Sequence, residues 1–160
     1  MNEIPRTWKV VTVWLLLATV LFLAIQAWLA GRQRAQFQAV GMGVVELQRS
    51  RDGHFHWPAL VNGKPVEFLV DTGATRTALP GALAARLGLE AGAAVHSSTA
   101  GGVVQGYEAV VHLALQGGPQ VERLRVTVLP ELQSPLLGMD VLARLRFTQQ
   151  GGVLRLEPAR

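Results

Sequence analysis

The sequence predicts a small domain built mainly of β-strands with a few short helices, preceded by a single transmembrane helix. Two features indicate this class. Residues 10–31 contain no charged side chain. From Gly53 onward, short apolar runs are broken by glycine and proline, which is typical of strands joined by tight turns. The 160 residues suffice for one membrane segment and one small domain.

The composition argues against several classes of function. The chain contains no cysteine, so it can form neither a disulfide nor a thiolate metal site. Its net charge is +4, but the basic residues are mostly scattered arginines. Because no basic cluster is interleaved with aromatic residues, we do not expect a nucleic-acid partner.

The apolar segment near the N-terminus has the length of a membrane helix, about 20 residues. Trp8 and Trp28 stand near its ends, where aromatic rings favour the membrane interface. A cleaved signal peptide is the alternative, but the run exceeds the usual length and Trp28 disfavours a cleavage site. The expected parts are therefore an N-terminal tail at 1–9, a transmembrane helix at 10–30, a polar linker at 31–52 and a folded domain at 53–160.

The first half of the domain predicts a hairpin followed by a third strand and a helix. Residues 54–61 and 66–70 read as strands, and Asn62-Gly63 between them is a strong signal for a tight turn. Residues 77–80 suit another short strand. Residues 81–87 suit a short helix that ends at Gly88.

The second half predicts a long hairpin, more strands and one further helix. Residues 93–115 form two β-like arms around a glycine-rich tip, which fits either a mobile lid or an ordinary surface hairpin. Residues 121–129 alternate apolar and polar side chains, as a half-buried strand does. A short helix is expected at 141–145, and the segments around Phe147 and at 153–156 are expected to close the chain as strands.

Asp71 is the candidate functional residue. It follows the apolar run 66–70, where a carboxylate is poorly solvated and needs a specific reason to be present. Thr72 can hydrogen-bond across a tight junction, and Gly73 lets the backbone come close to the carboxylate. Ala74 adds little bulk beside the acid.

These motifs resemble the membrane-anchored, retropepsin-like (clan AA) aspartic proteases of Gram-negative bacteria. The parts that carry the resemblance lie in order along residues 53–157: Gly53-His54-Phe55, Phe68-Leu69-Val70-Asp71-Thr72-Gly73-Ala74-Thr75, Thr99-Ala100-Gly101 and Leu136-Leu137-Gly138-Met139. The resemblance implies an all-β acid-protease barrel with one lobe per chain.

The resemblance also implies an aspartic endopeptidase that hydrolyses peptide bonds with an activated water and needs no metal or organic cofactor. The chain has only one Asp-Thr-Gly, and a domain of this size cannot hold two pepsin-like lobes. The second acid must then come from a partner, in a homodimer that pairs Asp71 of each protomer. The implied catalytic residues are Asp71, Thr72 and Gly73, and the implied peptide-binding residues are Ala74, Thr99, Ala100, Gly101 and Gly102.

Other readings stay open at this point. The domain could be a catalytically silent β module that binds peptides or assembles protein partners. His54 and His56 share one face of a strand and could hold a metal, but no third ligand is evident. The resemblance places the chain in the bacterial inner membrane with its domain in the periplasm, whereas the nearly balanced charges around the apolar segment leave its orientation undecided.

Overall fold

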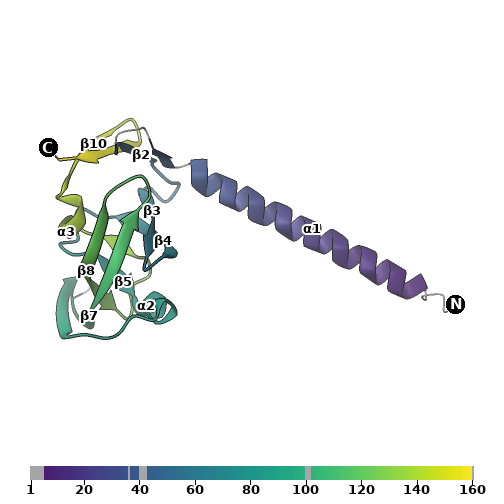
Figure 1. Cartoon of the computed structure of the whole chain (residues 1–160), viewed down its shortest axis with the longest axis horizontal. Coiled ribbons are helices and arrows are strands. Elements are labelled where there is room, and N and C mark those ends of the chain that lie inside the picture. The colour runs from purple at the N-terminus through teal and green to yellow at the C-terminus, as the bar shows by residue number, and fades with distance from the viewer. Residues whose placement is uncertain (1–5, 36, 40–42, 100–101, 160) are drawn as a thin grey trace. The chain divides into compact units, whose positions relative to one another are not determined.

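The computed structural model describes residues 6–35, 37–39, 43–99 and 102–159. The chain divides into two compact units, Met1–Ala35 and Gln36–Arg160. The first unit contains one helix, α1 (Arg6–Ala35), which is 30 residues long (Figure 1).

The predicted transmembrane helix at 10–30 is not supported. A membrane-crossing helix needs about 20 consecutive, mostly apolar residues. Among the residues that the structure describes, no helix meets the required combination of length and apolarity. The membrane attachment inferred from the sequence therefore has no support in the structure. The periplasmic location stays a prediction.

The second unit is mostly β-structure with two short helices, as the sequence predicts. Its strands, in chain order, are β1 (Phe37–Ala39), β2 (Val45–Gln48), β3 (His56–Val61), β4 (Lys64–Val70), β5 (Ala78–Pro80), β6 (Ala94–Thr99), β7 (Gly102–Leu115), β8 (Gln120–Leu129), β9 (Leu136–Leu137), β10 (Leu145–Gln150) and β11 (Val153–Pro158). Its helices are α2 (Gly81–Leu87) and α3 (Met139–Leu142). The second helix begins at Met139, two residues before the predicted start.

The larger sheet has the strand order β3-β4-β9-β5-β8-β7-β6, and a further pairing joins β3 to β7. The strands from β3 to β7 therefore form a closed ring, with β6 attached only to β7. Closure leaves few unpaired edges and encloses one apolar interior. Trp57, Phe68, Leu113 and Val128 are among the fully buried side chains of this interior.

The smaller sheet has the order β1-β2-β11-β10 and lies at the end of the unit opposite α2 (Figure 1). Its strand β2 falls within residues 31–52, which the sequence analysis treats as a linker. That interpretation is wrong for this strand, because Val45 and Leu47 are fully buried and β2 pairs with β11. The burial of these two side chains makes this segment part of the domain core.

Local turn chemistry agrees with the sequence. Asn62 and Gly63 have φ of 49° and 78°, so both central residues of the β3–β4 turn adopt the positive φ that a type I′ turn requires. Gly88 ends α2 in the left-handed conformation, and its N–H donates to carbonyls of the last turn. The β3–β4 turn sets the start of β4, the strand that leads to Asp71, and Gly88 sets the end of α2.

Candidate active site

Asp71 lies directly after β4, where the sheet is interrupted by a loop at 71–77. The two-residue strand β9 runs between β4 and β5, parallel to β4 and antiparallel to β5. The Asp71 N–H donates to the carbonyl of Leu137 in β9 at 3.1 Å. The strand register therefore sets the height at which the carboxylate leaves the sheet.

The Asp71 carboxylate is held by its own loop. Its Oδ1 accepts a hydrogen bond from the Gly73 N–H at 2.8 Å, and the Ala74 N–H donates to the Asp71 carbonyl at 3.3 Å. A Cβ at position 73 would lie 3.2 Å from Oδ1, so glycine avoids crowding the acid. Asp71 is partly exposed, while Thr72 and Gly73 are exposed in the single chain.

The start of α3 supports the far side of the loop. The N–H groups of Met139 and Asp140 donate to the carbonyls of Ala74 and Thr75 at 2.8 and 3.2 Å. Gly138, just before the helix, packs directly on the loop backbone. A Cβ there would collide with Arg76 and lie 2.7 Å from the Thr77 nitrogen. Position 138 needs glycine because two backbone segments approach closely there. Its backbone conformation does not require glycine, since a φ of −92° is open to any residue.

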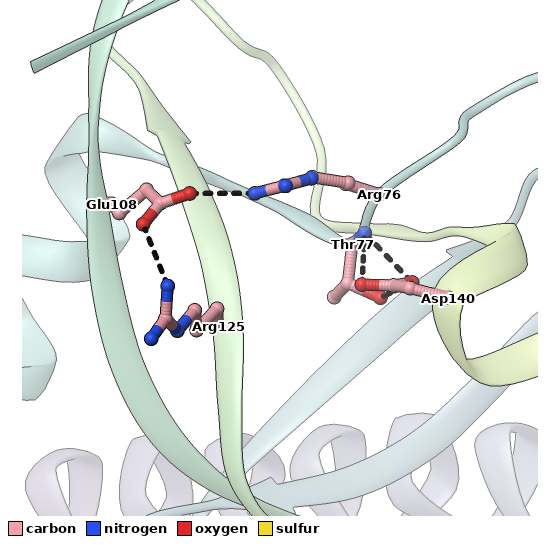
Figure 2. Close-up of polar contacts among 5 residues, drawn as sticks. All are labelled: Arg76, Thr77, Glu108, Arg125 and Asp140. Atoms are coloured by element: carbon pink, nitrogen blue, oxygen red, sulfur yellow. Dashed lines mark hydrogen bonds and ion pairs between the residues drawn. The ribbon is translucent and has the colours of Figure 1, made fainter.

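Thr77 and Asp140 form the polar connection beneath the loop (Figure 2). The buried Thr77 N–H lies 3.0 Å from both carboxylate oxygens of Asp140, and the Thr77 hydroxyl donates to Oδ1 at 2.8 Å. The same hydroxyl accepts the Gly138 N–H at 3.2 Å. One aspartate and one threonine therefore join the end of the loop to α3 and satisfy the buried donors.

A cavity of about 890 Å³ opens beside Asp71. Its lining comes from the loop, from β5 to β9 and from the segment between β8 and β9. The lining residues are Asp71, Gly73, Ala74, Thr75, Arg76, Ala78, Ala94, Val95, His96, Ser97, Ser98, Glu108, Thr127, Leu129, Leu132 and Leu136. A cavity of this size, mixed in polarity and beside a carboxylate, is the natural candidate for a ligand site.

Arg76 crosses from the loop to the long hairpin. Its Nη1 donates to Glu108 Oε1 at 2.6 Å, and Arg125 Nη1 lies 3.9 Å from Glu108 Oε2 (Figure 2). The side chain of Glu108 is 22% exposed, whereas those of Arg76 and Arg125 are 55% and 75% exposed. The loop is thus connected to β7 on one side by Arg76 and to α3 on the other by Thr77.

The structure brings together only some of the residues predicted for the site. Asp71, Gly73 and Ala74 line the cavity, whereas Thr72, Thr99 and Gly102 are not among its lining residues. Ala100 and Gly101 lie outside the residues that the structure describes. The roles predicted for these eight positions stay predictions.

His54 and His56, the alternative metal ligands, have a different arrangement. His56 Nε2 lies 2.8 Å from Asp52 Oδ2, and the His54 N–H donates to Asp52 Oδ1 at 3.0 Å. The backbone N–H of His54, with the His56 ring, holds the pKa of Asp52 below its usual range. Among the described residues, no group of three or more His, Asp or Glu side chains is placed to hold a metal ion.

Sequence reasoning missed Arg76, His96 and Glu108, the other charged or titratable residues of the cavity wall. A signal existed for Glu108, because it is a lone acid in the apolar strand that ends the long hairpin. Arg76 lies two residues after Ala74, the last residue of the Asp71 motif. No local sequence signal marks His96, because its place at the cavity depends on the pairing of β6 with β7.

Comparison with known proteins identifies the family. Residues 57–144 match the family model described as "gag-polyprotein putative aspartyl protease". A crystal structure of a retropepsin-like aspartic protease from Rickettsia conorii is 28% identical, with a TM-score of 0.56 over 71% of this chain and 89% of that one. The EIAV protease in complex with an inhibitor is 24% identical, with a TM-score of 0.49 over 59% of this chain and 89% of that one.

A curated protein from a Sinorhizobium species, described as "Uncharacterized protein in cobV 5'region", is 33% identical over 125 residues. The match covers 74% of this chain and 53% of that protein, so the chain spans about half the length of this relative. The matched family region contains the Asp71 loop, β9 and α3, which together build the candidate site. The chain therefore belongs to the retropepsin-like aspartic protease family.

Proposed function

We propose that the chain is an aspartic endopeptidase that works as a homodimer, with Asp71 of each protomer forming the catalytic pair. The observation that carries this proposal is the placement of Asp71. It leaves the sheet beside a cavity of about 890 Å³, and its Oδ1 is oriented by the Gly73 N–H. Family membership supports a protease, and the geometry of the loop supports Asp71 as its acid.

The need for a partner follows from the surroundings of Asp71. Two other acids lie near the loop, and both are engaged elsewhere. Asp140 accepts hydrogen bonds from Thr77, and Glu108 pairs with Arg76. Peptide hydrolysis by carboxylates alone needs two acids around one water. A second copy of the chain supplies the missing acid when the exposed tips at Thr72 meet across a two-fold axis.

The reaction then follows from the chemistry of two close carboxylates. They cannot both ionise easily, so they share one proton and titrate as a pair. The ionised Asp71 of one protomer takes a proton from the water, and the water oxygen attacks the peptide carbonyl carbon. The protonated Asp71 of the other protomer gives its proton to the carbonyl oxygen. When the tetrahedral intermediate breaks down, the C–N bond cleaves, the Asp71 that took the proton from water gives it to the amine nitrogen, and the other Asp71 takes a proton back from a hydroxyl of the intermediate.

The peptide is expected to lie in the cavity in an extended conformation. The hairpin of β6 and β7 provides one wall of the cavity, so the peptide backbone can pair with the edge of β6 there. The predicted contacts of Thr99, Ala100, Gly101 and Gly102 at the hairpin tip belong to this bound state. Closure of the hairpin would exclude water from the cleavage site.

Replacing Asp71 tests the proposal directly. The full chain is incubated with an unstructured protein such as casein from about pH 3 to pH 7, with and without a pepstatin-type inhibitor. Wild-type protein should cleave casein, and Asp71→Asn should reduce the rate by more than about 10³-fold because the general base is lost.

Asp52→Asn is the matched control, because Asp52 lies outside the cavity and its side chain is 49% exposed. It should cleave casein at the wild-type rate. Equal cleavage by wild type and Asp71→Asn would refute the proposal. Peptide binding without cleavage at any pH would favour a silent binding module.

A further inference from the structure

The cavity beside Asp71 contains one arginine whose hydrogen-bonding capacity is mostly unused. Arg76 lies five residues after Asp71 and lines the same cavity. A guanidinium carries five N–H donors in a fixed fork. In the part of the chain that the structure describes, the Arg76 side chain makes one hydrogen bond, to Glu108 at 2.6 Å. Its side chain is 55% exposed, so further donors face the cavity or solvent.

The pairing of Glu108 favours an anion over a cation as the ligand of Arg76. Glu108 is flanked by two arginines, Arg76 at 2.6 Å and Arg125 at 3.9 Å (Figure 2). Arg76 is the one arginine or lysine among the described residues that line the cavity, so it is the side chain there with which an anion can pair. A cationic side chain would gain little from Glu108, because arginines already face both of its oxygens. A carboxylate can use the remaining donors of Arg76, which match its geometry.

We infer that Arg76 is a specificity-determining residue that selects peptides carrying an acidic side chain next to the scissile bond. The inference rests on the proposed function, because it names the substrate class of the same site. Arg76 reaches the cavity from the loop that carries Asp71, so the selected side chain lies close to the bond that is cleaved. Glu108 is a competitor for Arg76 and limits the preference in the wild-type protein.

The test compares peptides that differ only in charge. Quenched fluorescent peptides carry either Glu or Gln at each position flanking the cleaved bond, and kcat/KM is measured for each pair with the full chain. At a pH above about 5, where the Glu side chain is ionised, the Glu peptide should be preferred roughly tenfold at one or more positions. The preference should vanish below about pH 4, because the Glu side chain becomes protonated while Arg76 stays charged.

Four variants separate the contribution of Arg76 from general charge effects. Arg76→Met should reduce the Glu/Gln ratio to about one, and Arg76→Lys should give an intermediate ratio because it keeps the charge and loses the fork. Glu108→Gln should raise the ratio, since the competing carboxylate is removed. Arg125→Met is the matched control: Arg125 contacts the same Glu108 but lines a separate hollow that contains no residue of the Asp71 loop. It should keep most of the preference.

A binding assay keeps this inference independent of catalysis. The Asp71→Asn chain, with or without Arg76→Met, is titrated with the same peptides and followed by fluorescence anisotropy. Tighter binding of the Glu peptides that is lost with Arg76→Met supports the inference, whether or not any peptide is cleaved. Binding without cleavage would count only against the proposed catalysis. A Glu/Gln ratio near one in the wild-type protein, a ratio unchanged by Arg76→Met, or no binding of any peptide would overturn it.

Discussion

Thr77 is the residue that fixes the end of the Asp71 loop. Its side chain is fully buried, and both its N–H and its hydroxyl bond to Asp140. A buried donor that loses its acceptor costs more than the hydrogen bond contributes, because the donor has already been removed from water. The Asp140 carboxylate therefore stabilises the fold and holds the loop in one position.

We expect Asp140→Ala to lower the free energy of unfolding by about 1–3 kcal/mol, because the buried Thr77 donors lose their acceptor. Asp140→Asn should cost less, since its amide oxygen can still accept one of these bonds. Urea denaturation measures both changes. Glu122→Ala, which removes an exposed acid of β8, is the control and should change stability little. An Asp140→Ala protein as stable as wild type would contradict this role.

The residues around Asp71 could be read from the sequence only where the signal is local. Asp71, Gly73 and Ala74 fall within four consecutive positions of one motif, so their convergence on one cavity was predictable. The role of Asp140 was not, because its partner Thr77 is 63 positions away in the chain. Glu108 and Arg76 are separated by 32 positions, and only the folded hairpin brings them together.

Among the elements, the hairpin of β6 and β7 is the proposed cover of the bound peptide. Residues 102–106 of β7 pair with β6 alone, and pairing with β8 begins at Tyr107. The outer half of the hairpin thus extends beyond the closed ring of strands. Val103, near its tip, has 69% of its surface exposed. An apolar side chain this exposed contributes little to folding in the single chain and is available to cover a peptide.

Val103→Ser should therefore separate binding from stability. We expect kcat/KM for peptide cleavage to fall up to about tenfold, because the bound state loses apolar contact. The free energy of unfolding should change by less than about 0.5 kcal/mol, since the side chain is exposed in the free protein. Val110→Ser is a matched control on the same strand, because its side chain is 51% exposed but belongs to the part of β7 that pairs with β8, away from the hairpin tip. Equal kinetic effects from both variants would contradict the lid assignment.

Elements were predictable from the sequence where turn residues mark their ends. The β3–β4 hairpin turns at Asn62-Gly63, and α2 ends at Gly88. Both elements lie where the sequence places them. Strand β2 has no such marker. It is four residues long, and its partner β11 lies more than 100 positions later, as the Glu46–Arg155 hydrogen bond across 109 positions shows. Alternation of apolar and polar side chains over so few residues does not distinguish a strand from a linker.

At the scale of the whole molecule, the second unit holds one barrel and one Asp-Thr-Gly motif. The sequence predicts this single lobe because the domain is too short for two. The proposed pairing of two Asp71 side chains rests on this single motif and on the family, because pairing across a two-fold axis would leave no periodic or local signal in one chain. The exposed Thr72 and Gly73 at the tip of the loop are the feature of the single chain that fits a partner there.

Mixing two forms of the chain tests whether one cavity uses two copies of Asp71. A fixed amount of wild-type protein is mixed in dilute solution with about a nine-fold excess of Asp71→Asn, and the mixture is then concentrated. If protomers pair at random, roughly one tenth of the wild-type chains keep a wild-type partner, and activity should fall to about that fraction. The same excess of Asp52→Asn should raise activity, because its own Asp71 is intact. Activity that is unchanged by excess Asp71→Asn would mean that each chain works alone, and the second acid would then have to come from the same chain, with Glu108 in the cavity wall as the first candidate.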